Sequence, residues 1–108
     1  MARVRREGAA FVDGWSLAEA RRIVREVLAG SGVDAWLFGS RAPGGSPRPF
    51  SDLDIALDGH GERVSPLLAS QVREALEESC IPFTADVVDL ADAPGLAEAV
   101  SRGVRWTD

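Results

Sequence analysis

The sequence has a single cysteine, no tyrosine, and no apolar run long enough to cross a membrane. One cysteine cannot form an internal disulfide, so Cys80 fits a protein of a reducing compartment, and we expect it to be a small buried residue. A transmembrane helix needs about 20 predominantly apolar residues in succession, so no membrane span is expected. The arginines that follow Met1 precede no apolar stretch, and a secretory signal is therefore not expected either. These absences together predict a cytoplasmic protein.

Basic residues are outnumbered by acidic ones, 12 to 17, and the net charge is −5. This balance argues against direct binding to nucleic acid, because a phosphate backbone is bound by a basic surface. Apolar residues make up 45% of the chain and charged residues 27%, as in ordinary globular proteins. A length of 108 residues suits one domain and is too short for two. We therefore expect a single domain over residues 1–108, in which residues 1–12 form a flexible arm or a short edge strand.

Hydrophobic periodicity and turn residues predict alternating helices and strands. Ser16 and Glu19 have the spacing of a capping box, so a helix is expected to begin there and to end at Gly30. The further predictions are strands over residues 34–38, 52–58 and 83–90, helices over residues 66–76 and 94–102, and a loop over residues 41–51. This order predicts an α/β (α+β) fold, with a small mixed β-sheet and helices packed on one face.

The segment Asp52–Asp58 alternates acidic and apolar residues. Residues i and i+2 of a strand lie on the same face, so Asp52 and Asp54 are expected to project together. Two such carboxylates repel each other unless a cation lies between them. Mg²⁺ suits this pair because it takes carboxylate oxygens and completes its shell with water and phosphate oxygens. The pattern indicates a divalent-cation site, and the alternative is an ordinary acidic strand that faces solvent.

Two further features accompany this strand. Gly39 and Ser40 come directly after an apolar strand, where a glycine lets backbone amides approach a phosphate closely. The adjacent Arg41 would either contact phosphate or be solvated. Asp86 is flanked by apolar residues within the third strand, where a charge needs a partner or a metal. Asp89 is the competing carboxylate, but its position at the end of the strand favours a capping role.

The segment Phe38-Gly-Ser-Arg-Ala42, followed after a loop by Ser51-Asp-Leu-Asp-Ile-Ala-Leu57, resembles the core motif of the polymerase-beta-type nucleotidyltransferase superfamily. The Gly-Ser-Arg-Ala form and the short length are similar to the minimal nucleotidyltransferases, which often pair with a HEPN-domain ribonuclease toxin encoded by a neighbouring gene. The resemblance runs from the first predicted helix to the last and implies a palm-like nucleotidyltransferase fold. Pro43 departs from the pattern, since a basic residue often stands there, and it predicts a shortened helix after Gly-Ser.

The resemblance implies metal-dependent transfer of a nucleoside monophosphate, most simply AMP from ATP, with other NTPs left open. The segment Gly39–Arg41 would bind the phosphates of the nucleotide. Asp52 and Asp54 would bind two Mg²⁺ ions, with Mn²⁺ as the substitute metal. Asp86 would complete the site of the metal that activates the acceptor hydroxyl.

The acceptor implied by the resemblance is a hydroxyl on a partner protein, often a tyrosine of the HEPN toxin. The chain would then be the antitoxin, a protein adenylyltransferase that forms a hetero-oligomer with its partner. Its end soon after the last predicted helix leaves no second domain for a small acceptor, which favours a protein acceptor. One alternative is a catalytically weak or inert antitoxin that neutralises its partner by binding alone, and another is a metal-binding domain without transfer chemistry. Trp15 and Trp106, near opposite ends of the chain, would mark a partner surface if exposed.

Overall fold

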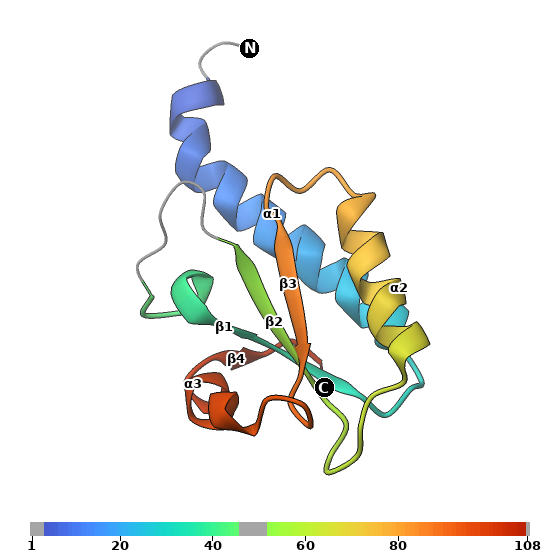
Figure 1. The fold of residues 1–108 in the computed structure, drawn as a ribbon. Helices are drawn as coiled ribbons and strands as arrows, with labels where there is room; N and C mark the ends of the chain where they lie inside the picture. Colours follow the sequence, from blue (N-terminus) through green and yellow to red (C-terminus); the bar gives the residue numbers. More distant parts are fainter. Residues whose placement is uncertain (1–3, 46–51, 108) are drawn as a thin grey trace.

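The computed structural model describes the backbone of residues 4–45 and 52–107 and the side chains of residues 15–45 and 52–107. Its elements, in chain order, are α1 (Val4–Leu28), β1 (Asp34–Phe38), η1 (Gly39–Arg41), β2 (Leu53–Asp58), α2 (Pro66–Glu77), β3 (Ala85–Asp89), η2 (Pro94–Leu96), α3 (Ala97–Ser101) and β4 (Val104–Arg105). The strands form a four-stranded sheet in the order β3-β2-β1-β4 (Figure 1). β1 is antiparallel to β2 and β4, whereas β2 and β3 are parallel. The expectation of a mixed sheet in an α+β domain is confirmed.

Helices cover both faces of this sheet. Alternate apolar side chains of β1 and β2 point to one face, where they form the main core with α1 and α2. Phe38 and Ala56 point to the opposite face, where Val100 of α3 packs against them. Figure 1 shows α3 set apart from α1 and α2, across the sheet. The expectation that the helices pack on one face is therefore wrong for α3, because apolar residues on the second face also need cover from water.

The first helix is longer than its sequence pattern predicted. Residues 4–12 belong to α1, so an edge strand is wrong for them, and residues 1–3 lie outside the described chain. Ser16 lies inside the helix and is fully buried, so it cannot cap a helix start. Glu19 instead pairs with Arg22 at 2.7 Å on the helix surface. A Ser-x-x-Glu spacing has the same appearance at a helix start and in a helix interior, which explains the error.

The β2–α2–β3 segment sets the register on which the site depends. Ser65 is the N-cap of α2 and Pro66 occupies its first turn, as predicted, although the Ser65 side chain makes no capping hydrogen bond. Val72 and Leu76 are the buried residues of this helix, which packs against α1 and β3. A helix between two strands of one sheet brings the chain back to begin the second strand beside the first. β2 and β3 therefore begin at the same end of the sheet.

The C-terminal residues extend the sheet beyond β1. The N–H of Trp106 donates to the carbonyl oxygen of Ala35 at 2.8 Å, next to the β1–β4 pairing. Trp106 is consequently only 4% exposed, so the expectation that it marks a partner surface is wrong, whereas Trp15 is 50% exposed.

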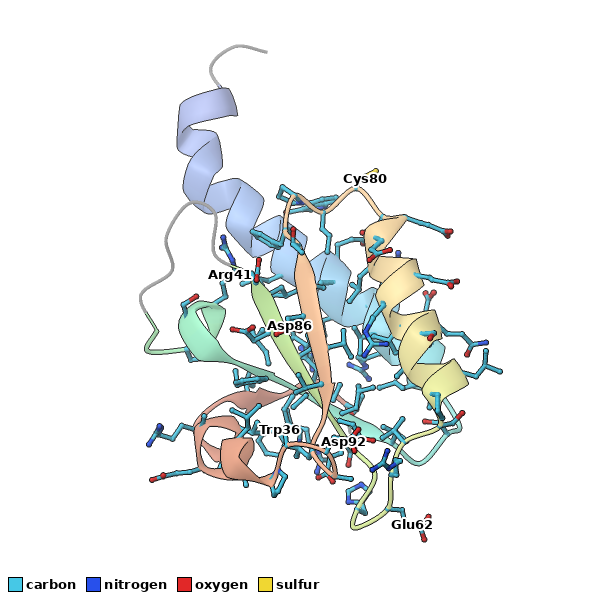
Figure 2. The ribbon with its side chains drawn as sticks, viewed as in Figure 1. Trp36, Arg41, Glu62, Cys80, Asp86 and Asp92 are labelled. Atoms are coloured by element: carbon cyan, nitrogen blue, oxygen red, sulfur yellow. The ribbon has the colours of Figure 1, made fainter. Side chains whose placement is uncertain are left out.

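Cys80 is exposed, so the expectation that it is buried is also wrong. It lies on the loop that follows α2 (Figure 2).

Candidate functional site

The parallel pairing of β2 and β3 places Asp54 directly beside Asp86. Paired residues of neighbouring strands lie on the same face of a sheet, and the strands are about 5 Å apart. Asp52 comes one residue before β2 and two residues before Asp54, which gives it the same facing as Asp54. The structure thus places Asp54 and Asp86 side by side, with Asp52 near enough for its charge to act on Asp54. They lie on the face that also carries Phe38, the β1 partner of Asp54.

Asp54 is the most enclosed of the three carboxylates. Its side chain is half-buried, whereas Asp52 and Asp86 are exposed. Burial raises the pKa of Asp54, and the negative charges of Asp86 and Asp52 raise the pKa further. Each of these influences disfavours the charged form of Asp54, so the site carries an electrostatic strain that a bound cation would relieve.

Asp86 belongs to the site through strand register and not through burial. Its position between apolar residues suggested a buried charge in need of a partner, but the side chain is exposed and has no such need. The register with Asp54 is what places it in the site. The competing Asp89 has a structural task, because its carboxylate accepts hydrogen bonds from the N–H groups of Val64 and Ala91, at 2.8 and 3.0 Å. The expected capping role of Asp89 is confirmed.

At Gly39 the main chain approaches the carboxylate of Asp54 closely. It follows β1 with a φ of +82°, a conformation that glycine adopts far more readily than any residue with a Cβ. A Cβ placed on Gly39 would overlap Oδ2 of Asp54 and would lie 3.1 Å from its Cγ. Two separate requirements therefore select glycine here: the left-handed backbone and the close approach to Asp54. A sequence reading can identify the first requirement from the turn, but only the fold shows the second.

Ser40 and Arg41 complete the short 3-10 turn η1. Ser40 is half-buried, and Arg41 is only 7% exposed, so the expectation of a solvated arginine is wrong. The guanidinium carbon of Arg41 lies 3.9 Å from the centre of the Phe83 ring, a cation–π contact that ties η1 to the segment before β3. Phe83 was expected only as a strand residue, and its partner 42 positions earlier could not be read from local pattern. A phosphate contact of Arg41 stays a prediction.

The side chains labelled in Figure 2 lie toward different ends of the sheet. Figure 2 shows Arg41 toward the same end as Asp86, whereas Trp36, Asp92 and Glu62 lie toward the other end. The functional candidates are therefore gathered at the end where β1 leaves the sheet and β2 and β3 enter it.

The opposite end of the sheet contains a separate polar network. Nε2 of His60 lies 2.8 Å from Oδ2 of Asp34, and the Thr107 hydroxyl donates to Oδ1 of Asp34 at 2.6 Å. The Thr107 hydrogen bond, followed by that of His60, lowers the pKa of Asp34 despite partial burial. The loop histidine of the Gly-His-Gly turn thus helps to join β1, the turn after β2 and the C-terminal segment.

The fit of a metal ion depends on the donor set. Within residues 15–45 and 52–107, no three acidic, histidine or cysteine side chains converge closely enough to enclose a metal. Mg²⁺ does not need such a cage, because it commonly binds one or two carboxylates and takes its other ligands from water and phosphate. The neighbouring carboxylates of Asp54 and Asp86, with Asp52 nearby, have the right chemistry for this mode.

Comparison with models of known protein families finds no match to this chain, and comparison with characterised proteins finds no matching sequence. In the portion that the structure describes, no helix combines the length and the apolar character that membrane crossing requires.

Proposed function

We propose that the chain is a metal-dependent nucleotidyltransferase that moves a nucleoside monophosphate from an NTP, ATP first among them, to a hydroxyl of a partner protein. One observation carries the proposal: Asp54 lies beside Asp86 and against the backbone of Gly39. The two carboxylates can bind a divalent cation, and the backbone of the adjacent glycine turn can bind the phosphates that accompany it. The Gly-Ser and Asp-x-Asp motifs that resemble this class of enzyme occupy these positions.

The carboxylates of Asp52, Asp54 and Asp86 would hold the divalent cations. Bound Mg²⁺ supplies charge neutralisation at the phosphates and a more acidic acceptor hydroxyl. The raised pKa of Asp54 agrees with this role, because burial and the charges of Asp86 and Asp52 disfavour its charged form, which a bound cation would favour. The palm-like fold implied by the motif is proposed on the same grounds, since a mixed sheet carries the site on one face at one end.

The transfer needs mainly positioning from the protein. The acceptor oxygen attacks the α-phosphorus in line, the bond from that phosphorus to the oxygen bridging to the β-phosphate breaks, and pyrophosphate leaves. Asp86 is exposed and can take the proton of the acceptor hydroxyl on a carboxylate oxygen, then release it to water. Gly39 and Ser40 orient the phosphates from the turn, and the stacking of Arg41 on Phe83 holds that turn in place.

The partner follows from the resemblance of the motif to minimal nucleotidyltransferases. We propose a HEPN-type toxin as the acceptor and the chain as its antitoxin, acting in the cytoplasm. Addition of AMP to a toxin hydroxyl, a tyrosine in the first instance, would place a negative phosphate and a bulky nucleoside on the toxin and so block its action.

The direct test incubates the chain with α-labelled NTPs, Mg²⁺ and the product of the adjacent gene. Label on that product is the expected result, with ATP as the best donor. Asp54→Asn and Asp86→Asn should each reduce labelling by at least about a hundredfold, as expected when a group acts on transition-state charge. Asp58→Asn is the matched control, because Asp58 lies on the same strand at the far end of the sheet and should label normally.

The outcomes separate transfer from binding. Labelling that survives both aspartate substitutions would remove the catalytic claim. Neutralisation of the partner that persists without any labelling would instead identify an antitoxin that works by contact alone.

A further inference from the structure

A hollow of about 440 Å³ lies between the turn that follows β1 and the end of α3. Its described lining consists of small residues and a single charged one: Gly39, Ala42, Pro43, Gly44, Gly45, Ala99, Arg102 and Gly103. Gly39 belongs to this lining and also contacts Asp54, so the hollow adjoins the carboxylate site directly.

The walls are small because the backbone packs closely around the hollow. A Cβ on Gly45 would overlap the carbonyl oxygen of Ser40, and a Cβ on Gly103 would overlap that of Leu37. The N–H groups of Gly45 and Gly103 already donate to backbone carbonyls, at 2.9 and 2.8 Å. These two amides are thus engaged within the protein, and the charge in the described lining belongs to one side chain.

Arg102 is that side chain. It follows α3 as its C-cap, is 70% exposed, and pairs with Glu98 at 3.5 Å. Exposed ion pairs of this kind contribute little, so the guanidinium can exchange Glu98 for an anion of higher charge. A guanidinium also matches phosphate oxygens in a bidentate arrangement that an ammonium group cannot make.

We propose that Arg102 is a further recognition residue for the part of the nucleotide released as pyrophosphate, which it contacts from the wall of this hollow. The inference rests on the proposed function, because it assigns the leaving group of that reaction to a place. Three carboxylates and a net charge of −5 repel the β- and γ-phosphates unless a cation accompanies them. Arg102 supplies a positive charge on the wall of the hollow that Gly39 lines beside Asp54.

The test measures binding of Mg²⁺-pyrophosphate and of AMP to the intact chain by titration calorimetry. Arg102→Gln should weaken pyrophosphate binding about tenfold, the effect of one charge-assisted phosphate contact, and should leave AMP binding unchanged. Arg102→Lys should recover only part of the loss, since the bidentate contact is missing. The matched control is Arg22→Gln, which removes an exposed, ion-paired arginine of α1 and should bind pyrophosphate normally.

A second variant tests whether Glu98 competes with pyrophosphate for Arg102. Glu98→Gln removes the competing carboxylate and should strengthen pyrophosphate binding severalfold. The proposal is overturned if the unaltered chain binds no pyrophosphate, or if Arg102→Gln binds it as tightly as Arg22→Gln does.

Failure of this inference is distinguishable from failure of the proposed function. If pyrophosphate binding depends on Arg102 but the chain labels no acceptor, the role of Arg102 stands and the proposed transfer reaction is wrong. If transfer depends on the aspartates but neither pyrophosphate binding nor turnover depends on Arg102, the transfer reaction stands and the role of Arg102 is wrong.

Discussion

Replacing Asp54 with asparagine should stabilise the folded chain when no divalent cation is present. Asp54 is half-buried and lies beside Asp86, with Asp52 nearby, and the substitution removes this repulsion while keeping the size of the side chain. Two charges about 5 Å apart repel by about 0.8 kcal/mol in water and about 3 kcal/mol near a protein surface. Since Asp86 and Asp52 are exposed, we expect a gain of about 1 kcal/mol, or about 4 °C in melting temperature.

The pH dependence of this gain has a definite sign. Because the pKa of Asp54 is raised, the folded chain keeps the proton to a higher pH than the unfolded chain does. The energetic penalty is absent below the ordinary aspartate pKa and complete above the raised pKa of the folded state. Denaturant unfolding in EDTA should therefore show the variant to be more stable at pH 7, with the difference vanishing near pH 3. A variant that is less stable at pH 7, or equally favoured at both pH values, would refute the reasoning.

Mg²⁺ should reverse the order of stability. A ligand that binds only the folded state stabilises it by about 2.7 kcal/mol at a hundred times its dissociation constant. The wild-type chain should gain in this way and overtake Asp54→Asn, which should gain little. Asp58→Asn serves as the control and should respond to Mg²⁺ as the wild type does, because Asp58 lies at the other end of β2. An equal gain in all three proteins would argue against a metal at Asp54.

Three further substitutions test the contacts of Gly39, the contact of Phe83 with Arg41 and the polar network around Asp34. Gly39→Ala should destabilise the chain by about 1–3 kcal/mol more than Gly44→Ala in urea unfolding, because both have positive φ but only Gly39 approaches another side chain; equal losses would contradict the close approach. Phe83→Leu should cost about 1 kcal/mol through loss of the Arg41 contact, and an unchanged urea midpoint would count against that contact. Asp34→Asn should lower the free energy of unfolding by about 1–2 kcal/mol at pH 7, because a carboxylate with a lowered pKa in the folded state stabilises the fold above the ordinary aspartate pKa. The loss should shrink as the pH falls through the pKa of the folded state. A loss that is constant with pH would contradict this assignment.

Local patterns predicted the elements that carry the site. The alternation from Asp52 onward identified β2, and the apolar run before Gly39 identified β1, because strand periodicity is written in neighbouring residues. Ser65 and Pro66 likewise marked the start of α2, where a fixed proline φ suits the first turn.

Features that depend on distant residues could not be predicted in this way. The pairing of Asp54 with Asp86 is a matter of strand order and register, which a single sequence leaves open. The burial of Arg41 requires Phe83, and the burial of Trp106 requires the two-residue strand that precedes it, too short for periodicity to show. The site was therefore predicted by residue type, and its assembly became visible only in the fold.

The most direct test of a metal-dependent nucleotide site is whether ATP and Mg²⁺ strengthen each other's binding to the isolated chain. Calorimetric titration with ATP should give binding in Mg²⁺ that is at least about tenfold tighter than in EDTA, a coupling of about 1.4 kcal/mol. Asp54→Asn and Asp86→Asn should abolish this difference, and Asp58→Asn should retain it. ATP affinity that is the same in Mg²⁺ and EDTA, or a coupling that survives loss of Asp54, would contradict the account.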